Sequence, residues 1–239
     1  MKSVSDGSAF PFGKGEPKPI SRSNQVVNIL YHHRTLGDGA EGIHIEEMIA
    51  AFRQLGHHVT VVSPVGERTN RGNQALSFGQ KLKAILPRVV FEMLEVGYNL
   101  AGMIAIWKAA RIRRPDFIYD RYITFNAAPV LMGRWLGVPV ILEVNAPLAL
   151  ERSQQPDEKL ILQSLAHRME RWICSNAHRA LVVSTPLKDY LVSIGVPSAR
   201  IEVVPNGANL SRFTGASTTG NGVREKLGIP ANEVVVGFT

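Results

Sequence analysis

Residues 26–62, VVNILYHHRTLGDGAEGIHIEEMIAAFRQLGHHVTVV, carry the pattern that decides the fold. The β-rich run Val26–Tyr31 precedes a loop with Gly37-Asp38-Gly39, and apolar residues then recur three and four positions apart over 45–55. This spacing predicts an amphipathic helix, ended by a C-cap glycine and followed by a buried strand at Val59–Val62. A strand, glycine loop, helix and strand in this order predict a right-handed βαβ unit with parallel strands.

The alternation of strands and helices continues along the chain. Strand-like runs lie at 117–119, 138–142, 180–183 and 201–204, with helix-length segments between most of them. This order predicts an α/β fold with a Rossmann-like, doubly wound parallel sheet. A Ser-, Thr- and Gly-rich stretch follows, and the later run Val234–Phe238 predicts the first strand of a second sheet.

Length and composition support one complete domain and the start of another. Of the 239 residues, 45% are apolar and 20% charged, as in ordinary globular proteins. We predict a disordered leader at 1–24, the Rossmann-like domain at 25–210, and a linker with an incomplete second domain at 211–239. The leader has no apolar run, so we interpret it as neither signal peptide nor membrane anchor. A single cysteine, Cys174, argues against an internal disulfide and favours a cytoplasmic protein.

Much of the net charge of +7 lies in the segment 81–115. Its apolar stretch Val96–Trp107 predicts either a helix lying peripherally on an anionic membrane surface or a core helix with a solvated basic end, and the core helix is the favoured interpretation. Glu92, Glu95 and the glycines argue against a spanning helix. No aromatic interleaving accompanies the basic residues, so nucleic acid is not an expected partner.

The loop Gly37-Asp38-Gly39-Ala40-Glu41 lies between the first predicted strand and its helix. Backbone N–H groups and the helix dipole favour phosphate at such a position, although a tight turn also needs glycine. Because Gly37, Gly39 and Gly42 do not have the G-x-G-x-x-G spacing, a nicotinamide cofactor is disfavoured.

Further polar residues follow the predicted strands. Asp120, Arg121, Glu143 and Asn145 lie at carboxyl ends, the edge where open α/β sheets bind ligands, and His33 follows the first strand at the same edge. Arg121 could hold a diphosphate or an acidic acceptor, and Glu143 could orient a sugar hydroxyl. The alternatives are a structural ion-pair cluster of Asp120, Arg121 and Glu143, and simple loop packing for His33.

Four segments, 37–57, 115–122, 137–147 and 203–207, together resemble the family-four retaining glycosyltransferases of the GT-B fold, with 234–239 resembling the strand that opens their second domain. The resemblance covers 28–239 and implies hexosyl transfer, with retention, from a nucleotide-diphospho-sugar to a sugar or lipid-linked acceptor, without a metal ion or other cofactor. It further implies polysaccharide biosynthesis in the cytoplasm or peripherally on the inner face of the membrane.

The resemblance also assigns residues. Gly37, Asp38, Gly39, Ala40 and Glu41 would approach the donor diphosphate. The acceptor cleft would be formed by His33, Asp120, Arg121, Glu143 and Asn145. The interdomain hinge would be formed by Asn206 and Gly207.

The sequence departs from the family in two ways. No residues correspond to the Arg/Lys pair and the Glu-x7-Glu element of the second domain, and many relatives have a histidine near Asp120-Arg121. Catalytic residues therefore stay unassigned, and we expect this truncated chain to have little or no activity by itself. The alternatives are a non-catalytic or complementing half that pairs with a separate donor-binding polypeptide and, less favoured, an NAD(P)-binding Rossmann enzyme.

Overall fold

The computed structural model describes residues 25–35, 39–63, 85–155, 159–207, 221–230 and 232–234. The predicted leader at 1–24, the loop residues Gly37 and Asp38, and most of the strand predicted at the C-terminal end, 235–238, lie outside the described residues.

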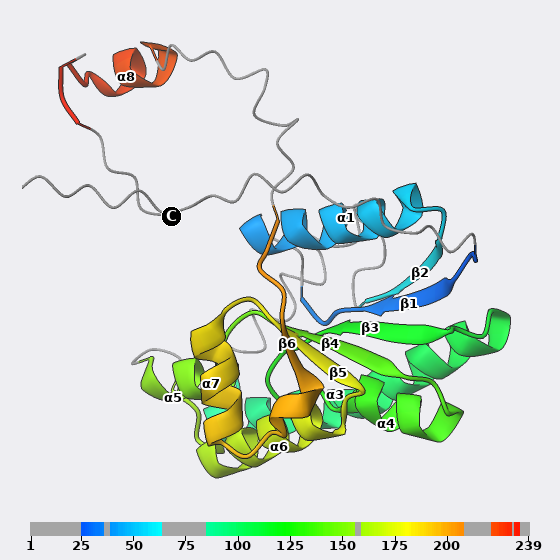
Figure 1. Ribbon diagram of the computed structural model, residues 1–239. Helices are drawn as coiled ribbons and strands as arrows, with labels where there is room; N and C mark the ends of the chain where they lie inside the picture. Colours follow the sequence, from blue (N-terminus) through cyan, green and yellow to red (C-terminus); the bar gives the residue numbers. More distant parts are fainter. Residues whose placement is uncertain are drawn as a thin grey trace, which may run out of the picture.

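Six parallel strands of the described chain form one sheet in the order β2-β1-β3-β4-β5-β6 (Figure 1). The sequence-based prediction of a doubly wound parallel sheet is confirmed. The order reverses between β1 and β3, which makes that edge the switch point where such folds bind ligands. The strands are β1 (Asn28–His32), β2 (His58–Val62), β3 (Phe117–Arg121), β4 (Val140–Val144), β5 (Arg179–Val182) and β6 (Ile201–Val203).

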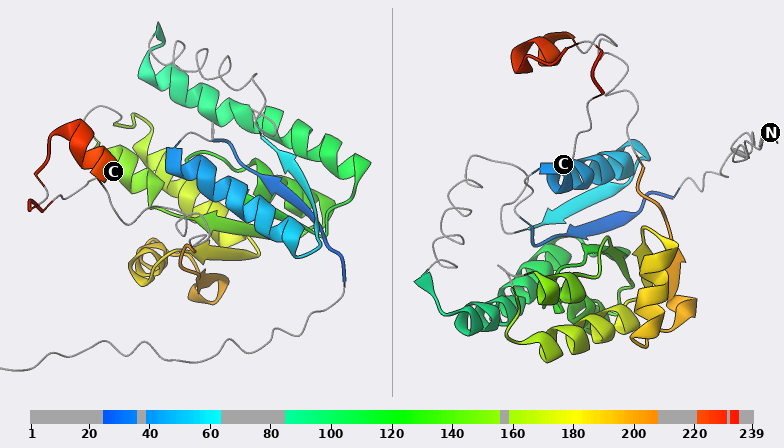
Figure 2. Two further views of the ribbon diagram at one scale, coloured as in Figure 1. Left: turned by 90° about the horizontal axis from the view of Figure 1, so that it is seen from above. Right: turned by 90° about the vertical axis from the view of Figure 1, so that its left-hand side faces the viewer.

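Helices cover both faces of the sheet (Figures 1 and 2). On one face lies α1 (Gly39–Gln54). The other face is covered by α3 (Arg88–Ile112), α4 (Ala128–Leu136), α6 (Gln163–Asn176) and α7 (Thr185–Ser193). Shorter elements are α5 (Leu148–Gln154), the 3-10 turn η1 (Ser198–Arg200) and α8 (Asn221–Leu227).

Helix α1 follows the predicted pattern at its C-terminal end and differs at its N-terminal end. Gly56 adopts a φ of 88°, and its N–H donates to the Arg53 carbonyl at 3.0 Å. The N–H of His57 donates to the Phe52 carbonyl at 3.1 Å, which completes a Schellman cap. The helix already begins at Gly39, so the second half of the predicted glycine loop is the first turn of α1.

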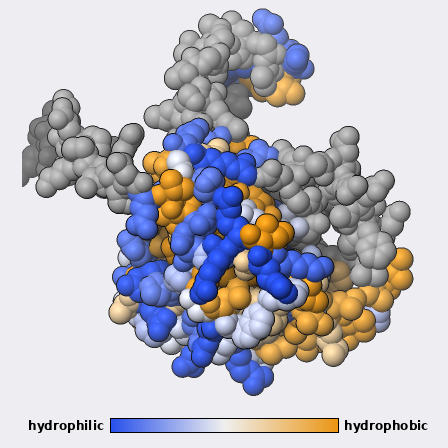
Figure 3. Space-filling view, turned by 90° about the vertical axis from the view of Figure 1, so that its right-hand side faces the viewer, coloured by the Kyte–Doolittle hydropathy of each residue, from blue (hydrophilic) through white to orange (hydrophobic). Residues whose placement is uncertain are grey.

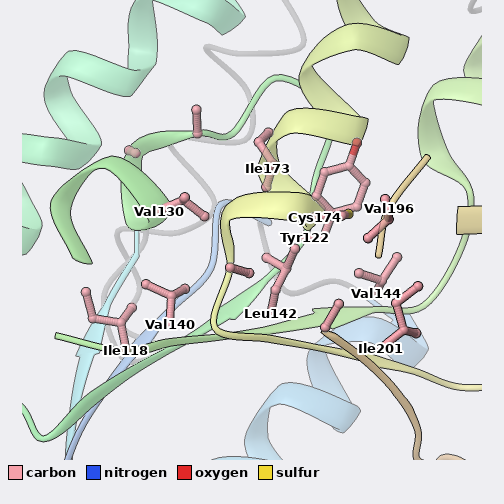
Figure 4. Close-up of a cluster of buried hydrophobic side chains, with 14 of the residues drawn as sticks. Ile118, Tyr122, Val130, Val140, Leu142, Val144, Ile173, Cys174, Val196 and Ile201 are labelled. Carbon is pink, nitrogen blue, oxygen red and sulfur yellow. The ribbon is translucent and has the colours of Figure 1, made fainter. Parts of the chain in front are cut away.

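The core consists of separate clusters on the two sides of the sheet. Side chains of a strand alternate between its faces, so Ile118 and Leu142 point toward α4 and α6, while Tyr119 points toward α1. Figure 4 shows the larger cluster, to which Val130, Ile173 and Cys174 contribute. Burial raises the pKa of the Cys174 thiol, as expected for a cysteine that acts as a small apolar residue.

A buried carboxyl ties α6 to its neighbours. Glu170 accepts hydrogen bonds from the Tyr122 hydroxyl at 3.1 Å, the Tyr190 hydroxyl at 2.7 Å and the Ala149 N–H at 3.2 Å. These donors come from the segment after β3, from α7 and from α5. Since Glu170 is completely buried, its carboxyl oxygens depend on these three donors in place of water.

Segment 81–115 forms α3 from Arg88, and its first residues, 81–84, lie outside the described chain. The favoured prediction of a core helix is wrong for most of α3: its buried residues are Glu92, Gly102 and Ile106, and 17% of its most apolar window is buried. By length and composition alone α3 could also cross a membrane, which is weak evidence for a single helix.

Gly133 allows α4 to pack directly on β4. A Cβ at this position would lie 2.9 Å from the Val138 carbonyl oxygen and would collide with the Val140 side chain. We expect Gly133→Ala to lower the free energy of unfolding by about 1–3 kcal/mol, because overpacking forces the backbone apart. Urea unfolding measures this, and Gly97→Ala is the control: nothing lies within 4 Å of its Cβ, so equal destabilisation by both variants would contradict the packing argument.

Candidate functional site

The polar residues predicted at the carboxyl edge of the sheet divide between its two faces. Arg121 and Glu143 lie on the α1 side, where they contact one another. Asp120 is one residue from Arg121 and therefore points to the opposite face, where it is completely buried. The expectation that all three side chains share one crevice is wrong for Asp120.

Glu143 is the centre of the cluster on the α1 side. Its Oε1 accepts hydrogen bonds from Arg121 Nη1 at 2.7 Å, from His44 Nε2 at 2.9 Å and from the Asn145 amide. Its Oε2 accepts one hydrogen bond, from the Tyr119 hydroxyl at 2.8 Å. Glu143, Arg121 and Asn145 were predicted for this edge, whereas His44 and Tyr119 were not.

The hydrogen bonds keep Glu143 ionised. Burial would raise the pKa of its carboxyl, but the hydrogen bonds from His44 and Asn145 outweigh burial and lower the pKa below its ordinary value. Because an ionised carboxylate only accepts hydrogen bonds, His44 Nε2 must carry the proton and the opposite ring nitrogen, Nδ1, can accept in the neutral ring. Oε2 of Glu143 likewise retains acceptor capacity, because within the described residues it accepts only the Tyr119 hydrogen bond.

Arg121 connects this cluster to the start of α1. Its Nε donates to Glu41 Oε1 at 3.0 Å, while Nη1 donates to Glu143. The Arg121 side chain is 12% exposed, compared with 42% for Glu41. One guanidinium therefore joins a residue predicted for the donor loop to a residue predicted for the acceptor cleft.

The predicted hinge adjoins the same cluster. The amide of Asn206 donates to Asn145 Oδ1 at 3.3 Å, and both Asn206 and Gly207 are exposed after β6. Asn145 thus links Glu143 to the segment that leaves the sheet.

A second polar group lies on the opposite face. His32 Nδ1 is 2.6 Å from Asp120 Oδ1, and the Asn126 amide donates to the same carboxyl at 3.4 Å. Burial raises the pKa of Asp120, and the hydrogen bond with His32 opposes the rise. These side chains are nearly inaccessible to solvent. Their hydrogen bonds connect β1, β3 and the segment before α4, which is a structural role.

His33 was also predicted for the acceptor cleft. It lies directly after β1, is 5% exposed, and its Nδ1 is 3.2 Å from the Thr35 carbonyl. Burial lowers the pKa of His33 to about 4, and His32 adds to the effect. The ring is therefore neutral at pH 7.

His33 should make stability depend on pH. In the unfolded chain the ring takes up a proton below its ordinary pKa of 6.5, but the folded chain does so only near pH 4. The contribution of neutral His33 to the free energy of unfolding is thus complete above pH 6.5. It falls by about 3 kcal/mol as the pH drops toward 4. Urea unfolding of the chain and of His33→Gln at pH 7.5 and 5 measures this loss. The variant should lose less, and the exposed His178→Gln should behave as the parent; equal slopes in all three would refute the assignment.

Several buried polar atoms near this edge have no hydrogen-bond partner within the described residues. One is Nη1 of Arg34, whose guanidinium lies over the Tyr98 ring at 4.5 Å from the centroid. The others at or near this edge are Tyr31 Oη, Thr35 Oγ1, Thr124 Oγ1 and Asn126 Oδ1. Buried polar groups that lack a partner among the described residues, beside the switch point, suit a polar ligand.

Sequence reasoning missed His44, Tyr119 and Arg34. His44 lies three residues after Glu41 in α1 and so shares its face, but this relation was hidden because the sequence predicted the helix only from Ile45. Tyr119 looks like an ordinary core residue of a strand, and its hydroxyl contact is visible only in the structure. Within the described chain no group of three or more His, Cys, Asp or Glu side chains could hold a metal ion.

The comparisons with known proteins match this chain to one family. Residues 41–212 match the family model described as Glycosyltransferase Family 4. That range contains the Glu41, Arg121 and Glu143 cluster and, of the strands in the described chain, all but β1. The comparison with curated proteins finds no match.

Solved structures show the same architecture. HepE from Anabaena with UDP-glucose has a TM-score of 0.57 at 12% identity, covering 84% of this chain and 50% of that one. A glycosyltransferase from Rickettsia africae gives 0.55 at 17% identity, covering 87% and 51%. A UDP-N-acetylglucosamine 2-epimerase from Rickettsia bellii gives 0.53 at 11%, covering 86% and 52%. The chain spans about half the length of these proteins, and identities this low establish the GT-B fold alone.

Proposed function

The chain belongs to glycosyltransferase family 4, and from this premise we propose that it is the acceptor-binding half of a retaining, nucleotide-sugar-dependent hexosyltransferase. The observation that carries the proposal is the Glu41–Arg121–Glu143 chain of ion pairs, which joins the start of α1 to the end of β4 at the switch point. The fold alone does not identify the reaction, because transferases and an epimerase share it; the family membership supports glycosyl transfer in general.

The first turn of α1 is the proposed contact with the donor diphosphate. Gly39 and Ala40 offer backbone N–H groups at the positive end of the helix dipole. Glu41 in the same turn would repel a diphosphate, but its pairing with Arg121 offsets that charge. In this proposal the leaving group is stabilised by cationic side chains and helix N-termini, without a metal ion.

The Glu143 cluster is the proposed acceptor contact. Oε2 of Glu143 can accept a hydrogen bond from a sugar hydroxyl, and Nδ1 of His44 can accept a second one. Arg121 and Tyr119 hold the carboxylate in place, so an acceptor meets a preorganised group. Asn206 and Gly207 would form the hinge to a donor-binding half, supplied in the same polypeptide or by a separate one, in the cytoplasm.

Calorimetry tests the proposal. We would titrate UDP, UDP-glucose, a GDP-sugar and NADPH into the chain by itself, then into the chain continued through the coding sequence after Thr239. Nucleotide-sugar binding that requires the added domain supports the division of labour. Binding and turnover of a donor by the short chain would overturn it, and tight NADPH binding would support the nicotinamide alternative. Activity that appears only on mixing two polypeptides would support a complementing half.

A further inference from the structure

One face of α3 is apolar and open to solvent. Between Val89 and Ile104, about 24 Å along the helix axis, no exposed side chain is charged. Figure 3 shows apolar side chains gathered at the lower right of that view, over α3. A contiguous apolar surface of this size marks a site of interaction. We call it the α3 face; its large exposed residues are Val89, Val90, Met93, Leu94, Tyr98, Leu100 and Ile104.

The acidic residues of this stretch point inward, where they accept hydrogen bonds or form an ion pair. Glu92 is 4% exposed and accepts hydrogen bonds from the N–H groups of Ile161 and Leu162, each at 2.7 Å. Glu95 pairs with Arg152 at 3.0 Å. No negative charge of the helix therefore lies on the α3 face.

Exposed cations stand at both ends of the α3 face. Arg88 is the first residue of α3, while Lys108 and Arg111 occupy its last turns. Arg113 and Arg114 follow directly and are also exposed. An apolar face with one cation at its N-terminal end and four at its C-terminal end matches a lipid surface with anionic headgroups, where each nearby cation adds attraction.

We propose that the α3 face docks on an anionic membrane surface, with α3 parallel to the bilayer plane. A spanning orientation would require breaking the hydrogen bonds of Glu92 and the packing of Gly102 on Ala128, where a Cβ on Gly102 would lie only 3.1 Å away. A second copy of this chain is disfavoured, because a two-fold contact between α3 faces would bring the terminal cations together.

Docking would bring the carboxyl edge of the sheet, on its Asp120 side, close to the lipid surface. The Asn99 side chain of α3 accepts hydrogen bonds from the N–H groups of Ala127 and Ala128, beside the edge that holds Asp120. Tyr98 contacts the guanidinium of Arg34, which follows β1 at the same edge and whose Nη1 has no hydrogen-bond partner among the described residues. Resting on the proposed function, this geometry assigns the acceptor to the lipid-linked class.

Vesicle flotation of the full chain tests the docking. We expect binding to phosphatidylcholine vesicles that contain a third of phosphatidylglycerol, weaker binding to pure phosphatidylcholine, and loss of binding in high salt. Leu100→Ser should weaken binding about tenfold, because a leucine leaves the interface. The matched control is Leu55→Ser directly after α1, since Leu55 is 69% exposed and Leu100 66%. Equal binding by both variants would overturn the proposal.

A fluorescent label locates the contact directly. The natural chain has one cysteine, Cys174, which is buried, so Leu100→Cys and Leu55→Cys can each be labelled selectively with an environment-sensitive dye. Addition of anionic vesicles should shift the emission to the blue at position 100 and leave position 55 unchanged. No shift at position 100 would contradict docking, even if flotation detected some binding.

Two further measurements test whether a second copy of this chain, or another part of the same chain, covers the α3 face in place of lipid. If the chain ignores vesicles but dimerises in light scattering, and Leu100→Ser abolishes the dimer, the face is a self-association surface. If Leu100→Ser lowers the melting temperature without changing oligomeric state or lipid binding, another part of the chain covers the face. Either result overturns membrane docking. Calorimetric binding of nucleotide-sugar by the continued chain should not change in Leu100→Ser, so a failure here is distinct from a failure of the proposed function.

Discussion

Replacing Glu143 by alanine is expected to lower kcat/KM for sugar transfer by two to three orders of magnitude in the enzyme that includes a donor-binding half. The substitution removes a carboxylate that accepts hydrogen bonds from Arg121, His44, Tyr119 and Asn145. Loss of one positioned group of this kind typically costs about 10²–10³ in rate. Initial rates over a range of acceptor concentrations measure the effect.

Three variants show whether the loss comes from the site. Glu202→Ala removes an exposed carboxylate from β6 and should leave the rate unchanged. Arg121→Lys keeps the positive charge but cannot bridge Glu41 and Glu143 as one fork, so its rate should fall less than that of Glu143→Ala. Full activity of a folded Glu143→Ala protein would show that the cluster is structural, as the ion-pair alternative holds.

Replacing Glu170 by alanine is expected to destabilise the chain by about 3–5 kcal/mol. The buried hydroxyl of Tyr122 loses its acceptor, and the volume of a completely buried side chain becomes a cavity. A domain at the low end of ordinary stability, about 5 kcal/mol, would be partly unfolded at 37 °C after such a loss. Urea unfolding followed by circular dichroism measures the difference.

The contribution of single hydrogen bonds to this cluster can be separated. Tyr190→Phe removes one donor to Glu170 from a partly exposed ring and should cost about 1 kcal/mol. Tyr122→Phe removes a fully buried donor and should cost at least as much. A change below 1 kcal/mol for Glu170→Ala would mean that this carboxyl does not hold α5, α6 and α7 together.

The sequence predicted the strands of the sheet because their signals are local. Runs of β-branched residues, the three-and-four spacing after Ile45 and the glycine at position 56 each follow from steric and hydrogen-bonding rules over a few residues. β4 was predicted two residues early, at 138 in place of Val140. Helix α1 was predicted too short, since nothing local distinguishes Gly39 in a loop from Gly39 in a first helical turn.

By itself, the sequence determined the alternation of strands and helices, the carboxyl edge as the place of Arg121 and Glu143, and the family. Only the tertiary structure decided that Asp120 lies on the opposite face, that His44 reaches Glu143 across 99 residues of chain, and that α3 turns its acidic side chains inward. The physical reason is the range of the interactions in sequence. Backbone preferences act between neighbouring residues, whereas these contacts join residues far apart in the chain. Which face of an almost wholly apolar helix is covered depends on elements that packing brings together, and local periodicity carries no record of them.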